Sequence, residues 1–219
     1  MTTALVIGGS GLVGSQLLGQ LLEDPNFGQV RALGRRGTGR SHPKLEDRVI
    51  DFDAPASWSA LVVGDVVFSC LGTTRRQAGS QVAQRKVDHD YPFEVAKAAR
   101  ANGVATFVLV SSASANPRSR IFYSRIKGEL DRDVQRLGFE RVRILRPSLL
   151  TGDRPDSRAG EKIGARVLGL LNGLGIARRY RAIPAATVAR AMIQVALDPA
   201  KGNCVYTLDE IFEEAERPR

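Results

Sequence analysis

The stretch that decides the fold is Leu5-Val6-Ile7-Gly8-Gly9-Ser10-Gly11-Leu12-Val13-Gly14, in which a short apolar run is followed by glycines at positions 8, 11 and 14. A helical pattern with apolar residues on one face then continues to about Leu22. This order of strand, glycine turn and amphipathic helix is typical of a site for the pyrophosphate of a dinucleotide. Gly8 allows the tight turn, Gly11 lets a phosphate approach the backbone, Gly14 lets helix and strand pack closely, and the helix N-terminus supplies free N–H groups. The alternative interpretation is a glycine-rich turn that binds nothing.

The residues after the next predicted strand indicate which dinucleotide is bound. NAD-binding units place an acidic residue about 20 residues beyond the glycines, where it accepts hydrogen bonds from the ribose 2′-hydroxyl. This chain has Arg35 and Arg36 there and no carboxylate. Two guanidinium groups favour a 2′-phosphate, so the sequence predicts NADP(H) rather than NAD(H), with a solvated basic loop as the alternative. Asp51 and Phe52, at the end of a third predicted strand, are candidates for contact with the adenine.

Short apolar runs bounded by turn residues alternate with helical patterns along the first two-thirds of the chain. This alternation predicts an α/β fold with a doubly wound parallel sheet, a Rossmann fold, in a single domain over residues 1–219. Residues 148–185 are predicted to form a small C-terminal lobe on the substrate side. The predicted strands lie near residues 3–8, 29–34, 47–51, 64–70, 104–111 and 139–146. The predicted helices lie near residues 11–23, 57–61, 78–101, 119–137, 163–176 and 185–197.

Composition and charge exclude several classes of function. The net charge of +9 invites a nucleic-acid interpretation, but the arginines are scattered through every segment and form no stripe interleaved with aromatics, so no nucleic-acid partner is expected. Two distant cysteines and two histidines predict neither a disulfide framework nor a metal site. No apolar run approaches a membrane span, and Met1-Thr2-Thr3 leads directly into the first predicted strand without room for a signal peptide. We therefore expect a cytoplasmic location and no membrane association.

The catalytic signal is Tyr123-Ser124-Arg125-Ile126-Lys127. A spacing of four places Tyr123 and Lys127 on one face of a helix. An ammonium group near a phenol lowers the pKa of the phenol, which is ordinarily about 10. Tyr123 can then act as an acid or base near neutral pH. The helix follows a predicted strand that ends in Ser111 and Ser112, whose hydroxyls would enter the same crevice. The alternatives are a solvated Tyr–Lys pair and serines that cap the end of a strand.

Together these residues resemble the short-chain dehydrogenase/reductase superfamily. Three runs narrow the resemblance to its atypical Tat-interacting-protein group: Cys70-Leu71-Gly72-Thr73-Thr74-Arg75, Tyr123-Ser124-Arg125-Ile126-Lys127-Gly128-Glu129 and Arg146-Pro147-Ser148-Leu149-Leu150. The resemblance implies an NADPH-binding protein of oxidoreductase architecture, with Lys127 bonded to the nicotinamide ribose. The other contacts that it implies are Ser10, Gly11, Leu12 and Val13 at the pyrophosphate, Arg35 and Arg36 at the 2′-phosphate, Leu71 and Gly72 at the adenosine ribose, and Leu150 and Arg158 at the nicotinamide end.

Two positions depart from the family pattern. The serine that polarises a substrate carbonyl is usually third in its run, where this chain has Ala113, so Ser112 is the predicted substitute. Asp88 stands where many relatives have an asparagine. The leading hypothesis is an NADPH-dependent reductase of a small-molecule carbonyl or similar electrophile, with Tyr123 as proton donor. The alternatives are an NADP(H)-sensing regulator with a protein partner and little catalysis, and an epimerase-type enzyme; a homo-oligomer is compatible with each.

Overall fold

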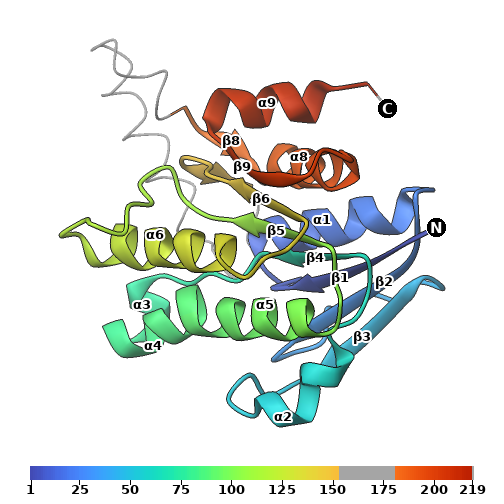
Figure 1. Ribbon diagram of the computed structural model, residues 1–219, viewed down its shortest axis with the longest axis horizontal. Coiled ribbons are helices and arrows are strands. Elements are labelled where there is room, and N and C mark those ends of the chain that lie inside the picture. The colour runs from blue at the N-terminus through green and yellow to red at the C-terminus, as the bar shows by residue number, and fades with distance from the viewer. Residues whose placement is uncertain (153–180, 219) are drawn as a thin grey trace.

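The structure, a computed structural model, describes residues 1–152 and 181–218. Its centre is a seven-stranded sheet in which every strand is parallel to its neighbours, in the order β3-β2-β1-β4-β5-β6-β9 (Figure 1). The strands are β1 (Thr2–Ile7), β2 (Phe27–Gly34), β3 (Leu45–Val49), β4 (Val66–Ser69), β5 (Thr106–Val110), β6 (Arg141–Leu145) and β9 (Gly202–Tyr206). The doubly wound Rossmann fold predicted from the sequence is confirmed.

The strand order reverses between β1 and β4. Ile7, the last residue of β1, pairs with Leu33 of β2 on one side and with Ser69 of β4 on the other. Every residue of β4 and β5 is buried because both faces of the sheet are covered, which explains their unbroken apolar runs. Open parallel sheets bind ligands outside the carboxyl ends of the strands, at the point where the order reverses. The fold therefore predicts a crevice beyond Ile7 and Ser69.

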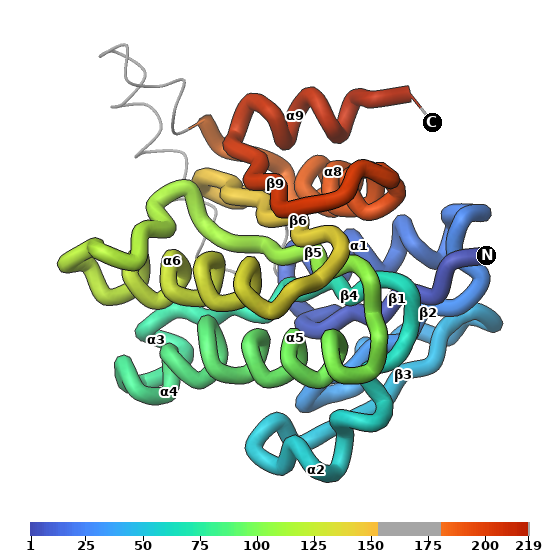
Figure 2. Tube along the Cα trace, in the orientation of Figure 1, coloured from blue at the N-terminus to red at the C-terminus, as the bar shows by residue number. Residues whose placement is uncertain are grey.

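Helices cover both faces of the sheet, as Figures 1 and 2 show. They are α1 (Leu12–Glu23), α2 (Pro55–Trp58) with the 3₁₀ turn η1 (Ser59–Leu61), α5 (Tyr91–Ala101), α6 (Phe122–Gln135), α8 (Ala185–Leu197) and α9 (Leu208–Glu216). Helices α1, α8 and α9 share one apolar core with the face of the sheet that contains Phe68. Helices α5 and α6 share a second core with the opposite face, around Phe107, and Trp58 of α2 closes that core beyond β3.

The segment predicted as one helix over 78–101 is divided in the structure. It includes only the last residue of α3 (Arg75–Ala78), and then α4 (Gln81–Arg85), the π-helical turn η2 (Lys86–Asp90) and α5, which follow one another without a break. Gly79 ends α3 with a left-handed φ of +81°, and the Ser80 hydroxyl caps α4 by accepting a hydrogen bond from the N–H of Ala83 at 3.1 Å. The predicted helix therefore begins at Gln81 and not at residue 78, because a helix stop at Gly79 is followed at once by a helix start at Ser80, and it continues through the π-helical turn to Ala101.

The C-terminal part contains two elements that the sequence pattern does not reveal. No residue of β9 is fully buried, so no apolar run marks this strand, and α9 begins at a capping box on Thr207. The guanidinium of Arg143 on β6 is completely buried and donates hydrogen bonds to the carbonyl oxygens of Val195, Ala200 and Gly202. Arg143 thereby joins the end of α8 to the start of the seventh strand.

Part of the predicted substrate-side lobe falls within the described residues. There β7 (Leu150–Thr151) pairs in parallel with β8 (Ile183–Pro184). The predicted helix 163–176 and Arg158 lie outside the described residues. Among the helices that the structure describes, none combines the length and the apolar character needed to cross a bilayer.

Candidate functional site

The turn between β1 and α1 is so tight that only glycine fits at two of its positions. Gly8 has a φ of +79°, and a Cβ added there would lie 2.6 Å from the carbonyl carbon of Cys70, just beyond β4. A Cβ added at Gly14 would lie 2.1 Å from the carbonyl oxygen of Gly8. The first turn of α1 therefore packs on the backbone of the loop, and the loop packs on the segment that follows β4. These contacts lie at the point where the strand order reverses, where the fold predicts a ligand crevice.

The N-terminus of α1 offers backbone donors. No side chain caps this helix, and the N–H of Ser15 donates to the carbonyl oxygen of Gly11 at 2.9 Å. Ser10 and Gly11 are exposed at the mouth of the turn. The side chain of Val13 is buried and that of Leu12 packs against the same core, so these two residues can meet a phosphate only through their backbone. A helix N-terminus of this kind is a common binding site for phosphate groups.

Arg35 and Arg36 are exposed directly after β2, at the same edge of the sheet. Within the described part of the chain neither guanidinium has an ion-pair partner. The carboxylate of Asp47, on neighbouring β3, accepts hydrogen bonds from the backbone N–H and the hydroxyl of Thr38 at 2.6 and 2.7 Å. Both arginines therefore remain available to an external anion.

The structure assigns Phe52 to the core and not to the open crevice. Its side chain is 3 % exposed, stacks on Tyr91 with ring centroids 5.2 Å apart and meets the edge of Trp58. Hydrophobic packing beyond β3 therefore holds its ring, so Phe52 can meet an adenine only through its backbone, and that contact stays a prediction. Asp51 is exposed and its carboxylate accepts the backbone N–H of Asp53 at 2.9 Å, so its role toward an adenine stays a prediction.

Lys127 is a buried cation. It is 2 % exposed, and its Nζ donates a hydrogen bond to the carbonyl oxygen of Val110 at 3.1 Å, at the carboxyl end of β5. Tyr123 lies one turn earlier on α6 and is 37 % exposed. Helix α6 therefore holds the ammonium group inside the protein and presents the phenol closer to solvent, on one face of the helix.

Two buried carboxylates accompany this cation. Asp88, from η2, is 1 % exposed and accepts the backbone N–H of Thr73 at 3.4 Å. Asp131, one turn beyond Lys127 on α6, is equally buried and forms an ion pair with Arg146 at 2.9 Å. Burial raises the pKa of both aspartates, and the nearby ammonium of Lys127 opposes that rise. The sequence analysis missed Asp131, although its spacing of four from Lys127 is a signal that could have shown it.

The serines after β5 have different surroundings. Ser111 is buried, and its hydroxyl lies beside Asp131 and lowers the pKa of that carboxyl against the effect of burial. Ser112 is half-buried, with its Oγ 3.1 Å from the Oγ of Ser114. Ala113 is exposed between them and contributes no hydroxyl. Ser112 therefore remains the candidate for orienting a substrate, while Ser111 belongs to the buried carboxylate.

The loop after β4 lies against Asp88, the buried carboxylate of η2. Leu71 packs partly against the core, and a Cβ added at Gly72 would lie 3.4 Å from the carboxylate of Asp88. Burial raises the pKa of the preceding Cys70 thiol to about 12, so this cysteine does not supply a thiolate nucleophile. Leu150, in β7, also packs against the core, and its predicted contact with the nicotinamide end stays a prediction.

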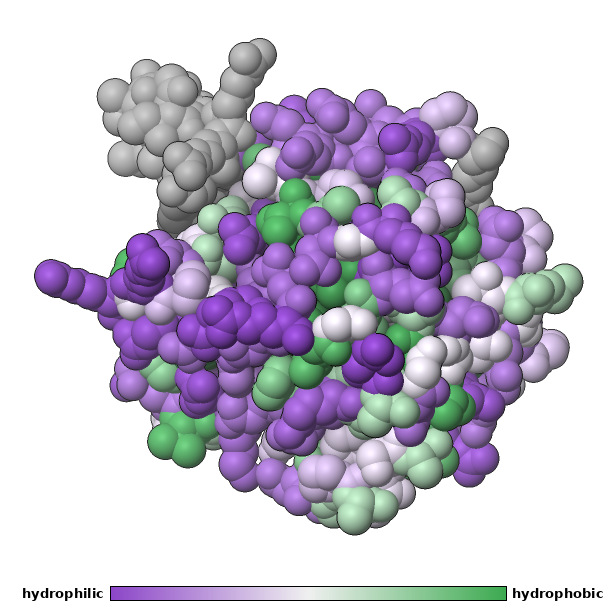
Figure 3. Space-filling model, viewed as in Figure 1, coloured by the Kyte–Doolittle hydropathy of each residue, from purple (hydrophilic) through white to green (hydrophobic). Residues whose placement is uncertain are grey.

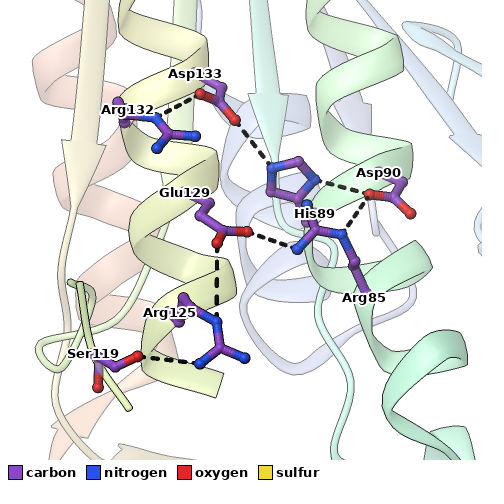
Figure 4. A network of polar contacts seen from close by, with 8 residues as sticks. All are labelled: Arg85, His89, Asp90, Ser119, Arg125, Glu129, Arg132 and Asp133. Atoms are coloured by element: carbon purple, nitrogen blue, oxygen red, sulfur yellow. Dashed lines mark hydrogen bonds and ion pairs between the residues drawn. The ribbon is translucent and has the colours of Figure 1, made fainter. Parts of the chain in front are cut away.

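A polar network fastens η2 to the flank of α6 (Figure 4). The buried ring of His89 lies between two carboxylates, with Nδ1 2.9 Å from Asp90 and Nε2 3.3 Å from Asp133. Arg85 forms an ion pair with Glu129 at 2.6 Å. These contacts hold the turn that carries the buried carboxylate against the helix that carries the Tyr–Lys pair.

Comparison with known proteins defines the class. Residues 8–199 match the model of an NAD(P)H-binding family, so the chain belongs to this family. Protein FMP52, mitochondrial, of Coccidioides immitis is 35% identical over 225 residues, which cover 93% of this chain and 89% of that protein. Protein HTATIP2 of Rattus norvegicus is 36% identical over 205 residues, which cover 92% of this chain and 84% of that protein. The predicted membership of the atypical, Tat-interacting-protein-like group is confirmed.

Solved structures share the fold at low sequence identity. A UDP-N-acetylglucosamine 4-epimerase from Methanobrevibacter ruminantium M1 superposes with a TM-score of 0.71 at 18% identity, over 97% of this chain and 80% of its own. DesIV, a dTDP-glucose 4,6-dehydratase from Streptomyces venezuelae with NAD bound, gives a TM-score of 0.72 at 19% identity, over 93% of this chain and 74% of its own. These likenesses agree with the Rossmann architecture seen in the sheet.

The expected cytoplasmic location is wrong. The FMP52 relatives of Coccidioides immitis, Aspergillus fumigatus, Candida glabrata and Saccharomyces cerevisiae are all named as mitochondrial proteins. The expectation used only the absence of a secretory signal peptide and of a long apolar run. Neither feature separates the cytoplasm from an organelle whose targeting segments are amphipathic and basic.

Proposed function

We infer that the protein is an NADPH-dependent reductase of a carbonyl or similar electrophile. The observation that carries this inference is the buried ammonium of Lys127 at the end of β5, one helical turn from Tyr123, in a member of an NAD(P)H-binding family. When bound, NADPH would supply a hydride for the carbonyl carbon. The Tyr123 hydroxyl donates a proton to the carbonyl oxygen, Lys127 stabilises the resulting phenolate, and Ser112 orients the oxygen.

The paired arginines after β2 support NADPH as the cofactor. An Arg35→Ala/Arg36→Ala variant should bind NADPH about tenfold to hundredfold more weakly, because two charge-assisted bonds to the 2′-phosphate are lost, and NADH with unchanged affinity. Energy transfer from Trp58, the single tryptophan, follows the titration. The matched control is Arg136→Ala/Arg190→Ala, which removes two exposed arginines, one directly after α6 and one on α8. Equal losses for both nucleotides would contradict the assignment.

The proton donor is tested with a Tyr123→Phe variant. Its NADPH oxidation with a panel of aldehydes and ketones should fall about a hundredfold or more, because the phenylalanine carries no transferable proton, while the dissociation constant of NADPH is retained. A Tyr206→Phe variant, which removes the phenol of β9, serves as the control. Turnover by Tyr123→Phe at the rate of the unaltered protein would remove this mechanism.

Two alternatives predict different outcomes for the same protein. A nucleotide-sensing regulator would bind a protein partner in an NADPH-dependent way and consume no cofactor, and Ala113 in place of a third serine favours it. An epimerase-type enzyme would convert its substrate with no net change in the nucleotide. Product analysis of the unaltered protein, together with a pull-down with and without NADPH, separates these alternatives from the reductase.

A further inference from the structure

The loops on the substrate side of the crevice have an unbalanced charge. Residues 70–87 after β4, 111–121 after β5 and 146–152 after β6 contain no aspartate or glutamate. The same loops carry Arg75 and Arg76 in α3, and Arg118 and Arg120 before α6. Because β4 and β5 are paired neighbours, with Ser69 opposite Leu109, the two arginine pairs follow adjacent strand ends.

These four arginines are exposed and lack acidic partners in residues 1–152 and 181–218. The arginines on the neighbouring flank are different. Arg85 and Arg125 both approach Glu129, at 2.6 and 3.9 Å, in the network of Figure 4. Asp88, which accepts the backbone N–H of Thr73 in the loop after β4, is buried and near Lys127. Among the described residues, positive charge without an acidic partner is therefore concentrated on the loops that follow β4 and β5.

The proposed cofactor does not account for this charge. Its pyrophosphate belongs at the glycine turn after β1, and its 2′-phosphate at Arg35 and Arg36 after β2. The loop after β4 begins with Leu71 and Gly72, which are expected at the adenosine ribose. Its later residues and the loop after β5 follow strands on the other side of β1 from Arg35 and Arg36, and we assign them to the substrate side. The four arginines therefore remain for a second anion.

Exposed apolar side chains share this edge. Val82 of α4 is 74% exposed, Ile121 at the start of α6 is 67% exposed, and Leu149 after β6 is 49% exposed. Figure 3 shows apolar patches among hydrophilic residues over α4 and the start of α6. Apolar surface beside fixed charges is the usual composition of a pocket for an organic ligand with one charged group.

We propose that the substrate is an organic anion, a carbonyl compound with a carboxylate or phosphate group on an apolar body, and that the arginine pairs Arg75/Arg76 and Arg118/Arg120 determine this specificity. The proposal rests on the reductase function and names its substrate class. The guanidinium groups bind the anionic group through charge-assisted hydrogen bonds, and the apolar side chains pack against the body.

A matched pair of substrates tests the proposal. The intact protein with NADPH should reduce para-carboxybenzaldehyde with a kcat/KM at least about tenfold higher than that for its methyl ester, because only the acid is charged. In Arg118→Ala/Arg120→Ala and in Arg75→Ala/Arg76→Ala the KM for the acid should rise about tenfold while the ester is unaffected. The control Arg136→Ala/Arg190→Ala, with the same loss of charge, should keep the preference for the acid. Equal kcat/KM for acid and ester, or an equal loss in the control, overturns the proposal.

A binding measurement separates this proposal from the reductase function. Calorimetry of the NADPH complex with para-carboxybenzyl alcohol and with its methyl ester needs no turnover. If the acid binds more tightly than the ester and this preference is lost in both arginine variants, the anion site is supported. If no aldehyde is reduced in that case, only the reductase function is contradicted. No preference for the acid in binding, with both aldehydes reduced, overturns the anion site and leaves the reductase intact.

Discussion

A single methyl group tests whether the glycine turn is the nucleotide site. In Gly14→Ala the new Cβ would lie 2.1 Å from the carbonyl oxygen of Gly8, so the helix and the turn must separate by on the order of 1 Å. Such overpacking costs about 1–3 kcal/mol, against a gain of about 1 kcal/mol in helix propensity. The free energy of unfolding should fall by about 1 kcal/mol. NADPH affinity should fall at least about tenfold, because the N–H groups of α1 are displaced.

Gly19→Ala is the matched control in the same helix. Its Cβ would meet the end of the flexible Arg40 side chain at 3.4 Å, which can move away. This variant should gain about 0.5–1 kcal/mol in free energy of unfolding and bind NADPH normally. Urea denaturation measures the first quantity and a fluorescence titration the second. If Gly14→Ala binds NADPH as Gly19→Ala does, the assignment of the turn to the pyrophosphate is refuted.

Two further variants test the surroundings of the buried cation. In Gly128→Ala the Cβ would lie 2.3 Å from the backbone of Asn116, so the loop after β5 must shift. Urea denaturation should show a loss of about 1–3 kcal/mol in free energy of unfolding, with NADPH affinity kept and turnover reduced. An unchanged unfolding midpoint would refute the contact. Burial raises the pKa of Asp88 above its unfolded value, so its ionisation costs stability as the pH rises through the folded pKa. Asp88→Asn should therefore be more stable than the unaltered protein at about pH 7 and lose that advantage toward about pH 4. Urea denaturation at both pH values measures the difference. A difference that does not depend on pH would show that ionisation of Asp88 does not destabilise the folded protein.

Local patterns in the sequence were sufficient for much of the fold. The glycines at 8, 11 and 14 specify a turn because the absence of Cβ atoms matters between neighbours along the chain, and the spacing of Tyr123 and Lys127 specifies one helix face. Buried strands can also be recognised in the sequence as continuous apolar runs, because both of their faces must be apolar. Local signals also explain why the predicted helix 78–101 begins only at Gln81, since Gly79 is a stop and Ser80 a cap.

Only the tertiary structure decided which of these helices and strands contact one another. The sequence alone determined that α6 carries a lysine and aspartates, but burial of Lys127 with Asp88 and Asp131 depends on η2 and β5 closing around it. Phe52 is in the core because Tyr91 and Trp58 pack on its ring, and β9 joins the sheet because the edge of β6 is open to it. Such contacts join segments far apart in the chain. Their energies depend on how deeply each side chain is buried, and no local stretch of sequence determines that burial.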